Sequence, residues 1–236
     1  MIRWRIDVPR GDRSTIVRSR DAVKNLIDAG LVRHGYTLDR SQPARYGFGV
    51  VAKRVNAPGD AIYHRVERII VGSSDPDVTK SLEEWAPEDL LEPNAVPGAG
   101  LDMRSSTLRR DESPVVGEAI SLYAVSPLRV LDARSGKSLL ELGPQWENAL
   151  NRTMSHRFNR PFHLRLIPDS WYVRSQQGKI VARMAVKVRD DGYVVAYPGL
   201  VLPFILAGPV DELHIAWYSG LGSSTAMGFG CVEVAR

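Results

Sequence analysis

Four glycines in eleven positions near the C-terminus form the segment best suited to chemistry. The pattern is Gly-Leu-Gly, five residues, then Gly-Phe-Gly, over residues 220–230. Glycine adopts positive φ freely and has no side chain to hold a ligand away, so such a loop can turn backbone N–H groups toward an anion. The alternative is a tight β-hairpin whose glycines serve only the turn. The loop residues expected to bind phosphate are Gly220, Gly222, Ser223, Ser224, Gly228 and Gly230.

Arginine provides the second chemical signal, because it outnumbers lysine 25 to 6. Its planar guanidinium binds phosphate bidentately and stacks on bases, which favours a nucleic-acid partner. The alternative explanation of the excess is a high-GC genome, which encodes arginine in place of lysine. One cluster, at the basic end of an expected helix, consists of Arg152, Arg157 and Arg160; a second, in a stretch rich in Pro, Gly and Ser, consists of Arg104, Arg109 and Arg110. Helix capping explains the first cluster equally well, and a solvated loop explains the second.

Several classes of protein are disfavoured by composition. The single cysteine and five scattered histidines lack metal-ligand spacing, so we expect no metal and no cofactor. The glycine loop lacks the Gly-Lys-Ser/Thr ending of a nucleotide-binding P-loop. The start of the chain does not resemble a signal peptide, and no apolar run is long enough to cross a bilayer. We therefore expect a soluble cytoplasmic protein that does not contact membranes.

The first half of the chain reads as strand, helix, strand, strand, helix and strand. Period-two alternation predicts a strand from Ile2 to Val8, and helical spacing predicts a helix within Asp12–Tyr36. The expected strands Tyr46–Val55 and Ala61–Val71 are joined by a turn at Asn56–Asp60. The expected helix Lys80–Leu91 is interrupted by Pro87, and a closing strand covers Ala119–Val125. The stretch Glu92–Gly117 has the composition of a mobile loop or inserted element.

The second half repeats this order less clearly. Gly143-Pro144 opens a helix that reaches about Phe158, and strands are expected at 164–167, 180–188, 194–197 and 213–218. The last of these would make the glycine loop a connection between two strands. The order predicts an α+β fold of two tandem ferredoxin-like, RNA-recognition-motif-like domains at 1–118 and 119–236, with an inserted segment at about 76–117 in the first.

The glycine pattern resembles the C-terminal glycine-rich loop of the CRISPR-associated endoribonucleases that process precursor CRISPR RNA, members of the RAMP superfamily. All four glycines and both hydrophobic positions, Leu221 and Phe229, agree with that pattern. The resemblance covers about the last forty residues well. It implies tandem ferredoxin-like domains, a CRISPR repeat RNA hairpin as partner, and the subunits of a CRISPR effector complex as a further class of partner.

The resemblance also implies RNA cleavage without a metal. The ribose 2′-hydroxyl next to the scissile phosphate attacks in line and leaves a 2′,3′-cyclic phosphate and a 5′-hydroxyl. The reaction needs a base, an acid and positive charge on the phosphorane. His34 is the first choice of base because the family often keeps a histidine just after the first helix; His64 is the second and His156 the third. The expected catalytic set is His34, Arg33, Arg18 and Tyr36, with Arg20 as an alternative to Arg18.

Two other interpretations stay open. A non-catalytic RAMP protein that holds the end of a guide RNA within an effector complex would share the glycine loop but would need no base. An RNA-recognition protein of unrelated biology would make the loop a coincidence. In each case RNA bases could stack on aromatic residues that lie near arginines, as in Trp171–Arg174.

Overall fold

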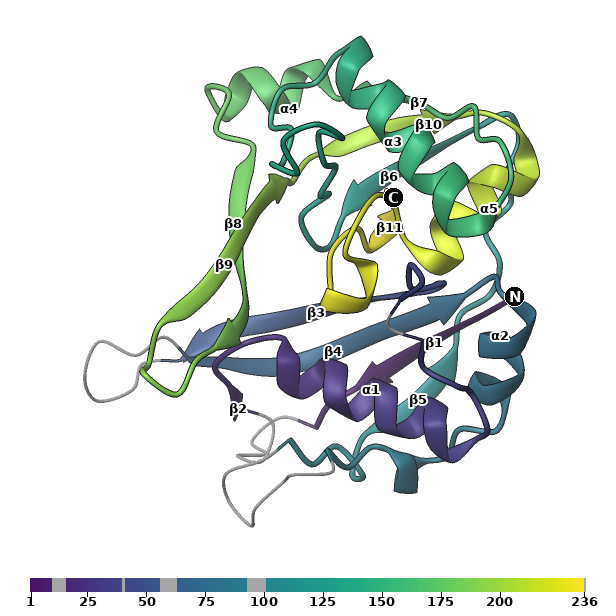
Figure 1. Cartoon of the computed structure of the whole chain (residues 1–236), viewed down its shortest axis with the longest axis vertical. Coiled ribbons are helices and arrows are strands. Elements are labelled where there is room, and N and C mark those ends of the chain that lie inside the picture. The colour runs from purple at the N-terminus through teal and green to yellow at the C-terminus, as the bar shows by residue number, and fades with distance from the viewer. Residues whose placement is uncertain (10–15, 40, 56–62, 93–100, 236) are drawn as a thin grey trace.

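A computed structural model describes residues 1–9, 16–39, 41–55, 63–92 and 101–235. These residues contain two larger antiparallel sheets with helices packed on them, and a separate two-stranded sheet (Figure 1). The expected turn at 56–60 lies outside the described residues. The N-terminal unit has the following elements: β1 (Ile2–Asp7), β2 (Ile16–Val17), α1 (Asp21–Arg33), β3 (Tyr46–Val55), β4 (Tyr63–Ser73), α2 (Pro76–Glu83), the 3-10 turn η2 (Pro87–Asp89) and β5 (Thr107–Arg110).

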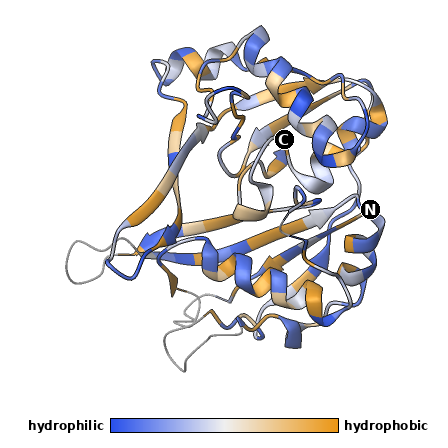
Figure 2. Cartoon of the chain, in the orientation of Figure 1, coloured by the Kyte–Doolittle hydropathy of each residue, from blue (hydrophilic) through white to orange (hydrophobic). Residues whose placement is uncertain are grey.

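The N-terminal sheet has the ferredoxin-like arrangement. β4 pairs with β3 on one side and with β1 and β2 on the other, and β5 closes the sheet against β1. Helix α1 buries Val23, Leu26 and Ile27, whose spacing places them on one helical face. Figure 2 shows hydrophobic and hydrophilic residues alternating along α1, as expected for a helix with one face on a sheet.

The C-terminal unit follows the same plan. Its elements are β6 (Ala119–Ala124), α3 (Pro144–Phe158), β7 (Arg165–Pro168), α4 (Ser170–Ser175), β8 (Val181–Val188), β9 (Val194–Leu200), β10 (Pro203–Ala207), α5 (Val210–Ser219), the 3-10 turn η3 (Thr225–Met227) and β11 (Val232–Val234). The sheet order β11-β6-β10-β7 places the first strand of the unit at the centre, as in a ferredoxin-like domain. The prediction of two tandem ferredoxin-like units is confirmed.

Several element predictions were wrong. The segment 213–218 is the second half of helix α5 rather than a strand, so the glycine loop joins a helix to a strand. Leu213, Ala216 and Trp217 have helical spacing, and Pro209 with the acidic pair after Val210 marks a helix start. Together with Leu213 and Trp217, the apolar residue Ile215 also gives a period-two alternation, which is typical of a strand.

The strand that closes the N-terminal sheet was also misplaced. It is β5, within the stretch predicted to be a loop, whereas 119–124 is the first strand of the next unit. The second predicted helix lies earlier than expected, at 76–83, because the Asp75 side chain caps its first turn. Strands β8 and β9 pair with each other, join neither of the two larger sheets and form an arm (Figure 1). Leu200 at the end of β9 forms an isolated antiparallel bridge with Leu128.

The two units contact each other through the open face of the N-terminal sheet. Glycines at this face allow close backbone approach: a Cβ on Gly47 would lie 2.3 Å from the carbonyl oxygen of Ser219. The buried Arg3 side chain donates hydrogen bonds to the carbonyl oxygens of Trp217 (2.6 Å) and Val232 (2.7 Å) and pairs with Glu233 at 2.7 Å. These contacts fix the end of α5, and with it the start of the glycine loop, on the N-terminal unit.

Candidate nucleic-acid interface

The glycine loop, residues 220–230, folds back on itself and is anchored by two buried apolar side chains. Leu221 and Phe229 are fully buried, and Phe229 packs against Met184 and Val186 of β8. Gly230 has a φ of +71°, and a Cβ there would lie 1.9 Å from the carbonyl oxygen of Leu221. Only glycine fits this crossing of the chain, so the pattern that identified the loop is partly a packing requirement.

Several backbone N–H groups of the glycine loop donate hydrogen bonds to carbonyl oxygens of the protein itself. The N–H groups of Leu221, Ser223, Gly228 and Gly230 donate to the carbonyl oxygens of Gly230, Arg129, Thr225 and Pro127, at 2.7 to 3.0 Å. These four groups are therefore committed to holding the loop. The expectation that the whole loop turns its amides toward an anion is corrected for these positions.

The Arg157 side chain is buried against the glycine loop and does not face solvent. Its side chain is 5% exposed, and its guanidinium donates to the carbonyl oxygens of Ser219 (2.9 Å), Gly220 (2.9 Å) and Gly222 (3.2 Å). Burial lowers the pKa of Arg157 to about 9, so the group remains charged at neutral pH. It also donates to the carbonyl oxygen of Ala44 at 3.2 Å. Arg157 therefore links the two units, and its expected RNA contact stays a prediction.

A groove opens beside the loop on the surface of α3. This loop groove has a volume of about 350 Å³ and is lined by the exposed side chains of Arg152 and His156 together with Ser223 and Ser224. The Ser224 hydroxyl accepts a hydrogen bond from Arg129 Nη1 at 2.6 Å. The groove brings together an arginine, a histidine and hydroxyl groups, which are ordinary protein contacts of RNA phosphates and sugars.

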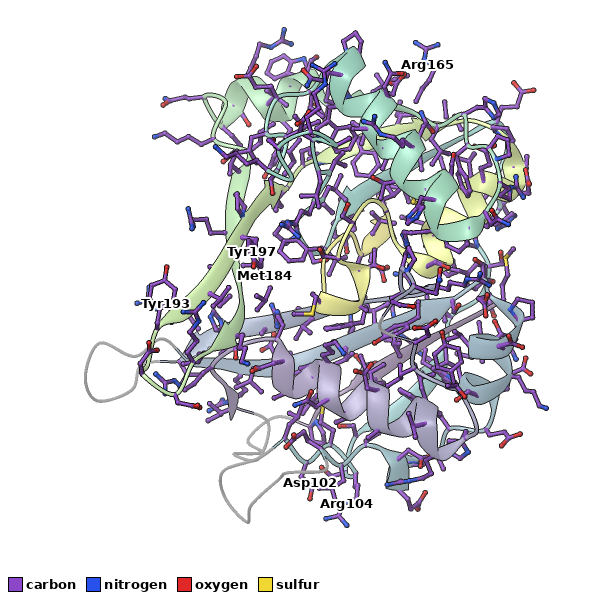
Figure 3. The ribbon with its side chains drawn as sticks, viewed as in Figure 1. Asp102, Arg104, Arg165, Met184, Tyr193 and Tyr197 are labelled. Carbon is purple, nitrogen blue, oxygen red and sulfur yellow. The ribbon has the colours of Figure 1, made fainter. Side chains whose placement is uncertain are left out.

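The arm formed by β8 and β9 carries the exposed aromatic residues nearest to the loop. The Tyr197 ring lies 4.3 Å from the Arg129 guanidinium, and Tyr193 near the tip is 62% exposed with Arg189 over its ring at 5.4 Å. Figure 3 shows Tyr193 toward the tip of the arm and Tyr197 and Met184 closer to the glycine loop. Exposed rings beside arginines can stack on unpaired bases. The sequence predicted these strands but not a separate arm, and Arg129 was not expected at the site.

A further exposed aromatic residue near an arginine lies on α4. Trp171 is 77% exposed, and the Arg174 guanidinium lies 5.7 Å from its ring centroid.

The expected catalytic residues are divided between the two ends of α1. Arg18 precedes the helix and His34 follows it, and thirteen helical residues at about 1.5 Å each separate their ends by about 20 Å. The two side chains therefore cannot meet at one phosphate. His34 contacts Asp89 (Nε2–Oδ2 2.9 Å) and Glu84 (Nδ1–Oε2 3.4 Å), and Arg33 also pairs with Asp89 at 2.7 Å. Arg33 and His34 thus fasten α1 to η2.

Tyr36 lies in a second pocket, of about 680 Å³, which also contains Lys24, Arg45 and Lys187. Burial and the nearby Asp75 carboxylate raise the pKa of Tyr36, so its hydroxyl can donate but does not ionise near pH 7. This tyrosine pocket shares Pro43, Ala44 and Ala226 with the loop groove, so the two hollows are neighbours.

The remaining predicted RNA contacts lie away from the groove. Arg160 pairs with Asp211, and Arg104 pairs with Asp102 at 2.7 Å. Figure 3 places Asp102 and Arg104 at the edge of the N-terminal unit that faces away from the glycine loop. Arg109 and Arg110 are exposed on β5, where Arg109 is paired in register with Arg5 of β1. The structure thus brings Arg152 to the loop but not the other exposed arginines of the two predicted clusters.

Two general properties of the described ranges bear on function. Among their His, Cys, Asp and Glu side chains, no group of three or more is arranged to hold a metal ion. The helices within these ranges are too short or too polar to cross a membrane.

Solved structures of other proteins share this architecture. No curated protein matches the sequence. Among solved structures, a Cas6-related gene product from Pyrococcus furiosus aligns over 100% of this chain and 98% of its own, with a TM-score of 0.67 and 15% identity. An RAMP protein that binds different RNA substrates aligns over 100% of both chains, with a TM-score of 0.65 and 16% identity. A Cas6 product complex aligns over 100% of this chain and 99% of its own, with a TM-score of 0.56 and 13% identity.

At these identities the structural matches establish a shared fold. The family of the C-terminal region of CRISPR associated protein Cas6 matches residues 112–234, a stretch that contains α3, the arm and the glycine loop. Because this match covers more than half of the sequence, the chain belongs to the Cas6 family of CRISPR-associated proteins.

Proposed function

We propose that this protein is an endoribonuclease that binds CRISPR repeat RNA, cleaves it to guide RNA and stays bound to the product hairpin. The observation that carries the proposal is the family match over residues 112–234, because this stretch supplies the three elements of the interface: α3, the arm and the glycine loop. The structural relatives include a Cas6 product complex and an RAMP protein described as binding RNA, which supports RNA as the ligand.

The RNA backbone is proposed to follow the loop groove and the arm. Arg152 and His156 on α3 face the groove, and Lys187 and Arg189 are exposed on the arm. An A-form stem is recognised mainly through its phosphates and shape, so cations spaced along a groove suit a hairpin. Tyr193 supplies a ring for an unpaired base at the edge of the stem.

The proposed reaction is a transesterification that needs no metal ion. The 2′-oxygen forms a bond to phosphorus, the P–O5′ bond breaks, and the products carry a 2′,3′-cyclic phosphate and a 5′-hydroxyl. Such a step is accelerated by a base that takes the 2′ proton and by cations that stabilise the charged transition state. Histidine and arginine side chains provide both functions near neutral pH.

A second candidate function is a non-catalytic RNA-holding subunit of a CRISPR effector complex. The observation that favours it is the engagement of His34, the first expected base, by Asp89 and Glu84. A histidine held by two carboxylates at a helix end serves the fold without any catalytic role. Both candidates require the interface, and only the first requires cleavage.

The test is cleavage of an end-labelled repeat hairpin, transcribed from the source genome's CRISPR array, by purified protein in excess EDTA. The endoribonuclease proposal predicts one cut, with a 5′ product that resists phosphatase until its cyclic phosphate is opened by acid. Intact RNA that nevertheless shifts fully in a binding gel would instead support the RNA-holding subunit. Failure to bind the hairpin at all would contradict both.

A further inference from the structure

A small cavity lined by arginines and a histidine lies where the arm meets the N-terminal sheet. This arginine pocket has a volume of about 110 Å³ and contains Arg18, Arg20 and His64 from the N-terminal unit and Arg183 from β8. Its other lining residues are Val17, Ser19, Met184 and Ala185. None of the eight is acidic. The local electrostatic potential is therefore positive, and a group of the size and charge of phosphate suits the space.

Arg20 is a partly buried cation of this pocket. Among the residues that the structure describes, its guanidinium has one hydrogen bond, from Nη2 to the carbonyl oxygen of Val50 at 3.3 Å. Burial lowers its pKa to about 10, so Arg20 stays charged at pH 7. Arg104 and Arg160, in contrast, each pair with an aspartate. A buried cation without a carboxylate partner is costly, and a bound anion would offset that cost.

His64 is one of the residues that line the arginine pocket. It is paired in register with Val17 of β2 on one side and with Arg54 of β3 on the other. Burial, Arg20 and Arg54 together lower the pKa of His64, so the imidazole is neutral at pH 7 and can accept a proton. The charged groups that lower the pKa of His64, Arg20 and Arg54, are cationic, and Arg18 and Arg183 line the same pocket.

The arm connects this pocket to the glycine loop. Met184 lines the pocket and also packs against the buried Phe229 of the loop. The backbone N–H of Arg20 donates to the carbonyl oxygen of Ala185 at 3.2 Å, which fixes β8 on the start of α1. RNA that lies on the loop and along the arm therefore passes the arginine pocket, which is lined by the middle of β8.

We propose that the arginine pocket holds the scissile phosphate of the repeat RNA and that His64 is the base for its cleavage. This inference rests on the proposed endoribonuclease function. His64 takes the proton of the 2′-hydroxyl, the O2′–P bond forms, the P–O5′ bond breaks, and the departing 5′-oxygen takes a proton from water. Arg20 and Arg183 stabilise the extra negative charge of the pentacoordinate phosphorus. His64 then releases its proton to solvent.

The kinetic test compares His64→Ala with His163→Ala, an exposed histidine of the C-terminal unit that contacts Glu212 instead of the pocket. Under single-turnover conditions in EDTA, His64→Ala should cleave about 100-fold more slowly or worse, as expected for loss of a general base. His163→Ala should match the wild type. Both variants should bind a 2′-deoxy repeat hairpin as the wild type does, which excludes misfolding. Equal cleavage by His64→Ala and the wild type would overturn the inference.

A second measurement tests the pocket without cleavage. In NMR spectra of the whole protein, the ring resonances of His64 should shift when inorganic phosphate is added, and Arg20→Met should abolish that shift. An unmoved His64 resonance in the wild type would overturn the phosphate site. If the wild type shows the shift but never cleaves repeat RNA, the proposed function fails while the pocket stands as an anion site.

Discussion

Nη1 of Arg157 donates a hydrogen bond of 2.9 Å to the carbonyl oxygen of Gly220, the first residue of the glycine loop. The same side chain reaches Ala44 of the N-terminal unit, so one guanidinium links helix α3, the loop and the neighbouring unit. Its guanidinium donates to backbone carbonyl oxygens of the loop region. The conformation of the loop therefore depends on a buried residue of helix α3.

Replacing Arg157 should test this link through stability. Arg157→Met removes several hydrogen bonds from a charged donor and leaves buried carbonyl oxygens unpaired, so the free energy of unfolding should fall by roughly 2–4 kcal/mol. Urea denaturation followed by tryptophan fluorescence measures the change. The matched control is Arg152→Met on the exposed face of the same helix, which should cost at most about 0.5 kcal/mol. Equal losses in the two variants would contradict the structural role of Arg157.

Alanine substitutions at Gly230 and Gly136 should distinguish the cost of a positive φ from the cost of a steric clash. Both have positive φ, +71° and +66°, but a Cβ on Gly230 would lie 1.9 Å from Leu221 O, whereas nothing lies within 4 Å of one on Gly136. Gly136→Ala should lower the melting temperature modestly, for a cost of about 1 kcal/mol. Gly230→Ala should cost several times more and weaken RNA binding in a gel-shift assay. Similar melting temperatures for the two variants would show that the loop tolerates a side chain.

Arg152 and Arg104 should differ in their effect on RNA affinity. If Arg152 contacts a phosphate, Arg152→Ala weakens binding and lowers the slope of log affinity against log salt by about 1. Arg104→Ala removes the same charge, but from an ion pair with Asp102 at a distant edge, so affinity and slope should stay at their wild-type values. Titrations of fluorescent repeat hairpin at several salt concentrations give both numbers. A larger effect from Arg104 would move the interface to the N-terminal unit.

Tyr193 should contribute through its ring. Tyr193→Ala is expected to lose about 1–3 kcal/mol of binding free energy, the usual contribution of one stacked base. Tyr193→Phe keeps the ring and loses only the hydroxyl, so it should bind as the wild type does. Equal losses in both variants, measured by the same titration, would assign the contact to the hydroxyl group instead.

Asp89 should make stability depend on pH in the acid range. Burial opposes its ionisation, but hydrogen bonds from Ala86 N, His34 and Arg33 outweigh it and lower the pKa of Asp89. The stabilisation is therefore fully present above the unfolded-state pKa, about 3.9, and is lost as the pH falls through the lower folded-state pKa. Asp89→Asn should be less stable than the wild type at pH 7, and the gap should narrow as the pH falls below about 3.9. A gap that is independent of pH would contradict this ionic role.

The sequence predicted the fold better than the details of its elements. Alternation in β1 and helical spacing in α1 and α3 depend on local patterns, and these elements formed close to where they were expected. Helix α5 was missed because burial on most sides gives Leu213–Trp217 both kinds of periodicity. Strand β5 was missed because its four residues have little apolar pattern, and their pairing with β1 is a contact between distant parts of the chain.

The site was less predictable than the fold, because it also depends on contacts between distant parts of the chain. Whether an arginine binds RNA depends on its partners, and these are set by tertiary packing: Arg157 is buried under the loop and Arg160 pairs with Asp211. The separation of Arg18 from His34 by the length of α1 could have been derived from helix geometry alone. The arginine pocket combines β4, the start of α1 and β8, which no sequence pattern joins.

We propose that the 2′-hydroxyl of the RNA is the nucleophile, and the removal of this one oxygen atom tests the proposal. A repeat hairpin with one 2′-deoxy nucleotide immediately 5′ of the cut should bind with unchanged affinity and remain intact in EDTA under conditions that cleave the all-ribose hairpin completely. Cleavage of the 2′-deoxy hairpin at the same position would contradict the account.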